Sequence, residues 1–170
     1  FFLLLQQRRL EKAENLLLEQ YGTSVDGLPE QHQQLYFFKK SMIRLVAGEA
    51  DAAGSFLERA IAEEADSAWD EMQVMFMTIS SALQSALGNA ELAELRLSGA
   101  ERAVRRARIN GLDDANINYT ESSIHALRGN TPAALQKLQV AYDRGFRQVW
   151  LLEFDRRLDS LRHEPQFLAL

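Results

Sequence analysis

The most informative stretch of the sequence is residues 122–141, which read SSIHALRGNTPAALQKLQVA. Gly129 stands between two segments whose apolar residues recur at helical spacing, and Pro132 follows Thr131 as in the first turn of a helix behind an N-cap. A glycine ends a helix easily because it adopts a left-handed backbone without steric cost. The stretch therefore predicts two helices joined by a tight turn at Gly129.

The same arrangement occurs twice more along the chain. Gly48 and Gly88 lie 40 residues apart, and Gly129 follows 41 residues later. Aligning the chain on these glycines gives further columns of identical residues: Ser41, Ser81 and Ser122; Ala53, Ala93 and Ala134; Leu57, Leu97 and Leu138; Ala60, Ala100 and Ala141. Alanine and leucine are common, so one column means little, but the set at constant spacing indicates an internal repeat.

The columns fit a unit made of two antiparallel helices, a helical hairpin. In each hairpin the leucine lies four residues after the first alanine, and the second alanine lies three residues after the leucine. This spacing places the three residues in one stripe on one face of the second helix. Small residues in that stripe, with the serine column on the first helix, let the two helices approach closely. The period also reaches back to Ala13 and Leu17, which predicts the second helix of an earlier hairpin.

We predict one all-α domain over residues 1–170. It comprises a half-repeat at 1–22, hairpins at 30–64, 67–110 and 114–145, and a C-terminal cap at 146–170. The helices are expected at 2–21, 30–47, 50–64, 67–87, 89–109, 114–128 and 131–144. Glycine and proline total twelve of 170 residues, nine and three respectively, and this disfavours an all-β protein with many tight turns.

Composition and charge narrow the classes of function. The net charge is −5, and a mildly acidic domain is a poor nucleic-acid binder, since neutralising phosphates supplies most of that affinity. The arginine-rich row 96–108 is therefore interpreted as a solvated helix face rather than an anion site. The chain has no cysteine, which excludes disulfides, thiolate metal sites and cysteine catalysis.

No candidate catalytic or metal site emerges from the sequence. The histidines, His32, His125 and His163, are far apart and lack a second ligand at metal-binding spacing. Phosphate-binding, nucleophile-elbow and zinc-protease motifs are absent from the sequence. We therefore expect a protein that is not an enzyme and that uses neither a metal nor a cofactor.

The serine, glycine, alanine, leucine and alanine columns, over about residues 30–144, resemble the tetratricopeptide repeat. That resemblance implies an α-solenoid of antiparallel helical hairpins whose first helices line a concave groove that binds a protein or peptide. The period of 40 to 41 residues departs from the standard of about 34, so the resemblance is to a long variant, similar to the repeats of large bacterial signalling proteins. HEAT-like repeats, at about 40–47 residues, are the alternative.

The segment from Leu152 to Phe167 carries a second resemblance. It is similar to the tails that close repeat arrays in bacterial multidomain proteins, among them winged-helix regulators and adenylate cyclases. The resemblance implies that Leu158, Leu161 and Phe167 cover the last core layer. The segment also departs from the 40-residue register, as terminal repeats do.

The candidate binding residues lie ten, six and three positions before each repeat glycine, on the faces that the resemblance turns toward the groove. They are Phe38, Met42 and Leu45; Thr78, Ala82 and Ser85; Tyr119, Ser123 and Ala126. This surface changes from apolar in the first hairpin to small and polar in the third. It would suit an apolar helix or an extended peptide, while packing within the core is the alternative for each residue.

The leading hypothesis is a non-catalytic protein- or peptide-binding scaffold module of a larger bacterial signalling or regulatory protein. The alternative is an oligomerisation or ligand-sensing regulatory module of a transcription regulator or cyclase. The apolar run Phe1–Leu5 would then support a homodimer, or follow a membrane tether that precedes a fragment beginning at Phe1. If a membrane helix preceded Phe1, Arg8 and Arg9 would favour a cytoplasmic location by the positive-inside tendency, with a periplasmic or membrane-tethered one left open.

Overall fold

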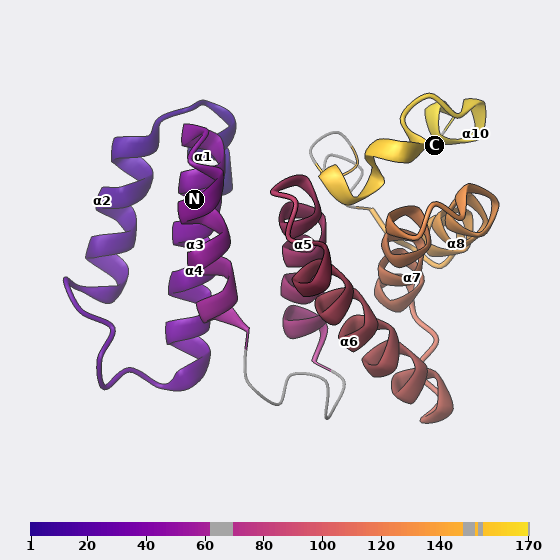
Figure 1. Cartoon of the computed structure of the whole chain (residues 1–170), viewed down its shortest axis with the longest axis horizontal. Helices are drawn as coiled ribbons and strands as arrows, with labels where there is room; N and C mark the ends of the chain where they lie inside the picture. Colours follow the sequence, from indigo (N-terminus) through magenta and orange to yellow (C-terminus); the bar gives the residue numbers. More distant parts are fainter. Residues whose placement is uncertain (62–69, 148–151, 153–154, 170) are drawn as a thin grey trace. The chain divides into compact units, whose positions relative to one another are not determined.

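A computed structural model describes residues 1–61, 70–147, 152 and 155–169. Within these ranges every regular element is a helix and no strand occurs, so the prediction of an all-α chain is confirmed. The chain divides into two compact units, Phe1–Glu63 and Glu64–Leu170. Each unit has its own packed helices (Figure 1).

The first unit contains α1 (Phe2–Gln6), α2 (Leu10–Tyr21), α3 (Glu30–Ala47) and α4 (Ala50–Ala60). The helix expected over 2–21 is broken, because Arg8 adopts a left-handed backbone with φ of 53°. The Arg9 N–H donates to the Leu4 carbonyl oxygen at 2.8 Å, which closes α1 in the way a glycine usually does. The break lets α1 contact both α2 and α3 and buries Leu5.

The hairpin of the first unit forms where the repeat predicted it. Gly48 has φ of 84° and ends α3, and α4 begins two residues later. Ala53, Leu57 and Ala60 are fully buried against α3, as the column stripe requires. Helix α4 ends at Ala60 because Ile61 has an extended backbone, so the helix expected to continue to 64 stops earlier; residues 62–64 lie outside the described residues.

The second unit contains two further hairpins. One pairs α5 (Glu71–Ala86) with α6 (Ala90–Ile109), and the other pairs α7 (Ala115–Leu127) with α8 (Thr131–Asp143). Asp70 accepts hydrogen bonds from the Met72 and Gln73 N–H groups at 2.9 and 3.2 Å, which caps α5. The helix was expected from residue 67, but Asp70 has an extended backbone and α5 begins at Glu71; residues 67–69 lie outside the described residues.

A 3₁₀ helix, η1 (Arg156–Leu161), and a single turn, α10 (Pro165–Leu168), follow the last hairpin. The helix η1 contacts α5, α7 and α8. Leu158 and Leu161 are fully buried in a cluster with α7 and α8 residues, and Phe167 packs against that cluster. The expected packing of these three residues on the last hairpin is confirmed.

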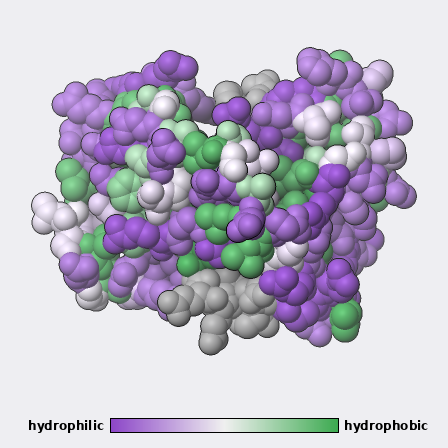
Figure 2. Space-filling view, in the orientation of Figure 1, coloured by the Kyte–Doolittle hydropathy of each residue, from purple (hydrophilic) through white to green (hydrophobic). Residues whose placement is uncertain are grey.

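Hydrophilic residues cover most of the surface seen in Figure 2, and apolar residues lie among them. Among the described helices, none combines the length and the apolar character that crossing a bilayer requires.

Candidate functional site

The faces of α5 and α7 in the second unit hold a piece of the chain's own C-terminal region. We call residues Asp155–Leu161 the tail segment. The Asp155 carboxylate accepts from the Arg157 N–H at 3.0 Å and so starts η1. A 3₁₀ helix has three residues per turn, so Leu158 and Leu161 extend from the same side of η1 into the core.

A buried ion pair anchors the tail segment. Arg157 Nη2 lies 2.5 Å from Asp155 Oδ2, and each side chain is only 7% exposed. Arg157 Nη1 donates to Thr78 Oγ1 of α5 at 2.7 Å. The Tyr119 hydroxyl of α7 donates to Asp155 Oδ2 at 2.5 Å. One ion pair thus contacts both helices through neutral hydroxyl groups.

The electrostatics of this site keep both partners ionised. Burial by itself would raise the pKa of Asp155, but the Arg157 guanidinium outweighs it and holds that pKa below its ordinary value. Burial by itself would lower the pKa of Arg157, but the attraction of the Asp155 carboxylate is the larger effect, so the pKa of Arg157 is raised. Burial and the adjacent Asp155 carboxylate raise the pKa of Tyr119, so its hydroxyl stays a donor.

One contact orients Tyr119, and another joins the tail segment directly to α7. The Tyr119 ring stacks on Phe146 with centroids 4.3 Å apart, which holds the hydroxyl in place. Ser160 Oγ donates to the Ala126 carbonyl oxygen at 3.3 Å. The tail segment is therefore held on the second unit by one buried ion pair, two leucines and one further hydrogen bond from Ser160.

The structure places the nine candidate groove residues in different surroundings. Five of them, expected to face an open groove, are buried instead: Phe38, Thr78, Tyr119, Ser123 and Ala126. The tail segment contacts Thr78, Tyr119 and Ala126. The Ser123 hydroxyl bonds the Tyr119 carbonyl of its own helix at 3.1 Å, and Phe38 lies beside the Phe2 ring at 6.5 Å.

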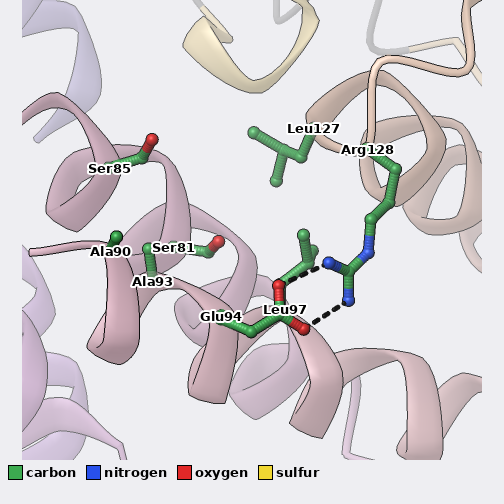
Figure 3. Close-up of a pocket in the computed structure, with 8 residues that line it drawn as sticks. All are labelled: Ser81, Ser85, Ala90, Ala93, Glu94, Leu97, Leu127 and Arg128. Atoms are coloured by element: carbon green, nitrogen blue, oxygen red, sulfur yellow. Dashed lines mark hydrogen bonds and ion pairs between the residues drawn. The ribbon is translucent and has the colours of Figure 1, made fainter.

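The other four candidates remain accessible. Met42 and Leu45 of α3 and Ala82 of α5 are half-buried, and Ser85 of α5 is exposed. Ser85 is the candidate that lines a cavity of about 190 Å³ in the second unit (Figure 3). The walls of this cavity come from α5, α6 and the end of α7: Ser81, Ser85, Ala90, Ala93, Glu94, Leu97, Leu127 and Arg128.

The rim of this cavity is charged. Arg128 donates to Glu94 at 2.5 Å and to Glu101 at 2.6 Å. The hydrogen bond from Arg128 lowers the pKa of Glu94 to about 2. Two carboxylates of α6 thus share the guanidinium of Arg128, at the end of α7. Alanine and leucine side chains form the apolar part of the cavity lining.

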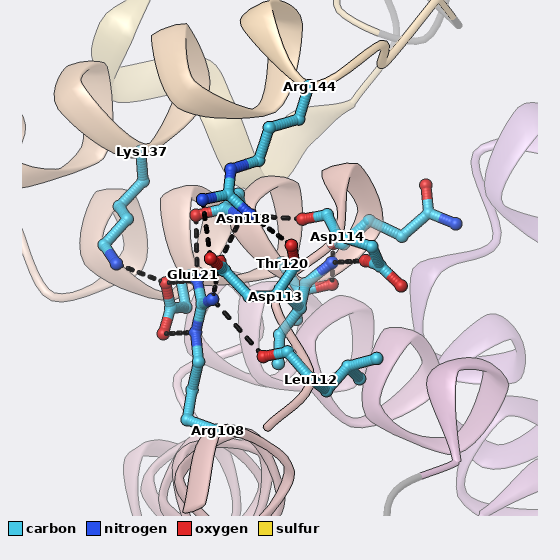
Figure 4. Close-up of polar contacts among 11 residues, drawn as sticks. Arg108, Leu112, Asp113, Asp114, Asn118, Thr120, Glu121, Lys137 and Arg144 are labelled. Atoms are coloured by element: carbon cyan, nitrogen blue, oxygen red, sulfur yellow. Dashed lines mark hydrogen bonds and ion pairs between the residues drawn. The ribbon is translucent and has the colours of Figure 1, made fainter. Parts of the chain in front are cut away.

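A second polar cluster joins α6, α7 and α8 (Figure 4). Arg108 of α6 donates to Glu121 of α7 at 2.6 Å and also pairs with Asp113. Lys137 of α8 lies 2.5 Å from Glu121, and Arg144 lies 2.5 Å from Asp113. Arg108 was expected on a solvated face, but its side chain is only 22% exposed because it extends toward α7. The ion pairs of this cluster join α7, which carries Tyr119, to α6 and α8.

The sequence did not single out Arg157 or Asp155 as functional residues. The available signal was an arginine between the apolar residues Leu152 and Leu158, preceded two residues earlier by an acid. The tail segment holds two adjacent arginines and two acids, so its composition alone does not show which arginine is buried; burial of Arg157 requires a counter-ion, and Asp155 is that group.

Over the ranges that the structure describes, no group of three or more His, Asp or Glu side chains is placed to hold a metal ion. In the comparisons with known proteins, no family model, curated protein or solved structure matches the chain.

Proposed function

We propose that the chain is a non-catalytic module that binds a protein or peptide partner, within a larger bacterial signalling or regulatory protein. In this proposal its helical hairpins belong to a tetratricopeptide-like solenoid, and the faces of the first helices of the hairpins receive the partner.

The observation that carries the proposal is the seating of the tail segment on α5 and α7. These helices accept a non-α-helical piece of chain through the Thr78 and Tyr119 hydroxyls and through the apolar contacts of two leucines. A surface that holds a peptide in this way has the chemistry that peptide recognition needs, namely a few oriented polar groups within an apolar surround.

Candidate residues that remain accessible in each unit support the same function. Ser85 lines the small cavity between α5, α6 and α7, whose apolar floor and charged rim suit a single partner side chain. In the first unit, Met42 and Leu45 leave part of the α3 face uncovered.

Peptide selection on the full chain tests the proposal. A displayed peptide library is selected on the immobilised protein, and the affinity of recovered peptides is measured by fluorescence anisotropy. Ser85→Arg places a large charged side chain on the accessible face of α5, and Met42→Arg does the same on α3. Ile109→Arg is the matched control, because Ile109 of α6 is 78% exposed.

We expect saturable binding in the micromolar range, weakened about tenfold by one of the two face variants and unchanged in the control. Circular dichroism verifies that each variant is helical. If no selected peptide saturates below about 1 mM, the proposed function is wrong.

An oligomerisation module is the second candidate, and exposed apolar residues of the first unit favour it. Phe2 is 45% exposed and Leu3 63% exposed on α1. Light scattering across a concentration series distinguishes the candidates. A dimer that Leu3→Glu dissociates would favour assembly, and a monomer at all concentrations would count against it.

A further inference from the structure

We propose that the faces of α5 and α7 form a binding site for partner segments of the pattern Asp-x-Arg-Leu-x-x-Leu, and that the tail segment is the intramolecular occupant which such a partner displaces. The inference rests on the proposed function and names the partner's chemistry.

The polar part of the pattern follows from where the charges lie. The helices contribute the uncharged hydroxyls of Thr78 and Tyr119, while the tail segment contributes both Asp155 and Arg157. A buried charge without its partner is strongly unfavourable. A competing segment must therefore bring both an acid and an arginine, at the same spacing of two residues.

The apolar part of the pattern follows from the two leucines. Leu158 and Leu161 are fully buried in the cluster that includes Ala134, Leu135 and Leu138 of α8. A segment that lacks one of the two leucines would leave a cavity in this cluster, and such a cavity would weaken its binding because interiors are close-packed. The spacing of three residues matches one turn of the 3₁₀ helix.

The variable positions follow from exposure. Arg156 and Asp159 have side chains that are 77% and 48% exposed, and they contact each other at 3.5 Å on the solvent side. Ser160 is exposed and adds one hydrogen bond, at 3.3 Å, to Ala126. These three positions do not restrict the partner, so they are written x in the pattern.

Competition from the tail segment lowers the apparent affinity of the site for an external partner. A tethered segment competes at an effective concentration of order mM, so an external peptide at similar concentration occupies a substantial fraction of the sites. Weakening the tail segment raises the fraction of open sites, and the apparent dissociation constant falls accordingly.

The test uses the full chain and a fluorescein-labelled peptide of residues 155–164, DRRLDSLRHE. The peptide is titrated into the wild-type chain and into Arg157→Ala, whose own tail lacks the anchor. Arg156→Ala is the matched control, because it removes an exposed arginine one position away. We expect Arg157→Ala to bind at least about tenfold more tightly than the wild type and the control.

Two further changes assign that binding to the site. Replacing the third residue of the peptide by alanine should abolish tight binding to Arg157→Ala. Adding Thr78→Val to Arg157→Ala should weaken binding of the unaltered peptide, since Thr78 accepts the hydrogen bond from the arginine. Equal binding of both peptides would overturn the inference.

A measurement on the wild-type chain keeps the inference testable if Arg157→Ala does not fold. A spin-labelled DRRLDSLRHE peptide at about 1 mM should broaden the NMR signals of Thr78 and Tyr119 and leave those of Ile109 sharp. An absence of broadening at Thr78 and Tyr119 would overturn it. If selected peptides bind the chain and this peptide does not, the inference fails and the proposed function stands; if neither binds, both fail.

Discussion

Ser122 Oγ of α7 donates a hydrogen bond of 2.8 Å to the carbonyl oxygen of Ala134 in α8. Both residues are fully buried, and they belong to two columns of the 40-residue sequence repeat. A side chain reaches the backbone of the neighbouring helix only where the two helices cross closely. The small residues of the repeat therefore set the distance between the helices of this hairpin.

The serine column contains a natural comparison. Ser41 occupies the equivalent position in the first hairpin and is fully buried, but its hydroxyl has no hydrogen-bond partner. We expect Ser122→Ala to lower the free energy of unfolding by about 1 kcal/mol, because a buried acceptor loses its donor. Ser41→Ala should be neutral or stabilising. Urea denaturation of both variants measures the difference, and an equal loss in the two would contradict the account.

The alanine columns predict a size limit at the crossings. Ala100 of α6 is fully buried, and Ala86 at the end of α5 is exposed. Ala100→Leu should destabilise the chain by about 1–3 kcal/mol because the inserted atoms overpack the interface. Ala86→Leu is the control and should leave the unfolding midpoint within about 0.5 kcal/mol of the wild type. A stable Ala100→Leu would show that the small residue is not needed for close approach.

The turn glycine Gly129 has φ of 72°, and no atom lies within 4 Å of the position that a Cβ would occupy. Gly129→Ala should therefore cost about 1 kcal/mol through backbone strain alone. Gly129→Asn should cost less, since asparagine tolerates the left-handed conformation. Thermal unfolding of the two variants ranks them, and the reverse order would mean that steric contact rather than φ sets the cost.

The ion pair of the tail segment lends itself to a double-mutant cycle. Asp155→Leu leaves the Arg157 charge buried without a counter-ion and should destabilise the chain by about 3–5 kcal/mol. Arg157→Met leaves the carboxylate and should have a similar effect. The double variant should be less destabilised than the sum of the singles, which denaturant unfolding of the three proteins tests. Additive effects would mean that the two groups do not interact.

Glu121 makes part of the stability dependent on pH. Burial opposes its ionisation, but hydrogen bonds from Arg108 and Lys137 outweigh burial and hold its pKa below its ordinary value of 4.5. A lowered pKa in the folded state contributes stability that is present above 4.5 and is lost as the pH falls through the folded-state pKa.

As the pH falls below 4.5, the stability of the wild type should therefore decrease more steeply than that of Glu121→Gln, which has no proton to gain at this position. Urea unfolding at several pH values compares the two slopes. Identical slopes would show that this carboxylate has the same pKa in the folded and unfolded chain.

The helices were predictable because their signals are local. Helix α3 spans residues 30–47 as expected, since an apolar periodicity and the glycine at 48 lie within one short stretch. The break at Arg8 was missed, because a left-handed arginine carries no sequence signal of the kind that glycine gives. The apolar stripe continues through it.

The candidate site was predicted only in part, for a different reason. Thr78 and Tyr119 were expected to face an open groove, but both are buried, and the segment that covers them is distant in the sequence. Arg157 follows Thr78 by 79 residues, so no local pattern relates the two. Covering of a helix face by a remote segment is a tertiary property, and repeat periodicity carries no information about it.

The separation in sequence between Thr78 and Arg157 also determines the order in which parts of the second unit fold during synthesis. Each hairpin pairs helices that are adjacent in the chain, so it can form soon after it leaves the ribosome, whereas contacts between distant segments form later. Residues 155–161 follow α7 in the chain, so the α5 and α7 faces leave the ribosome before the tail segment does. Under the proposal above, this interval is the stage at which a nascent chain displays these faces without their own occupant.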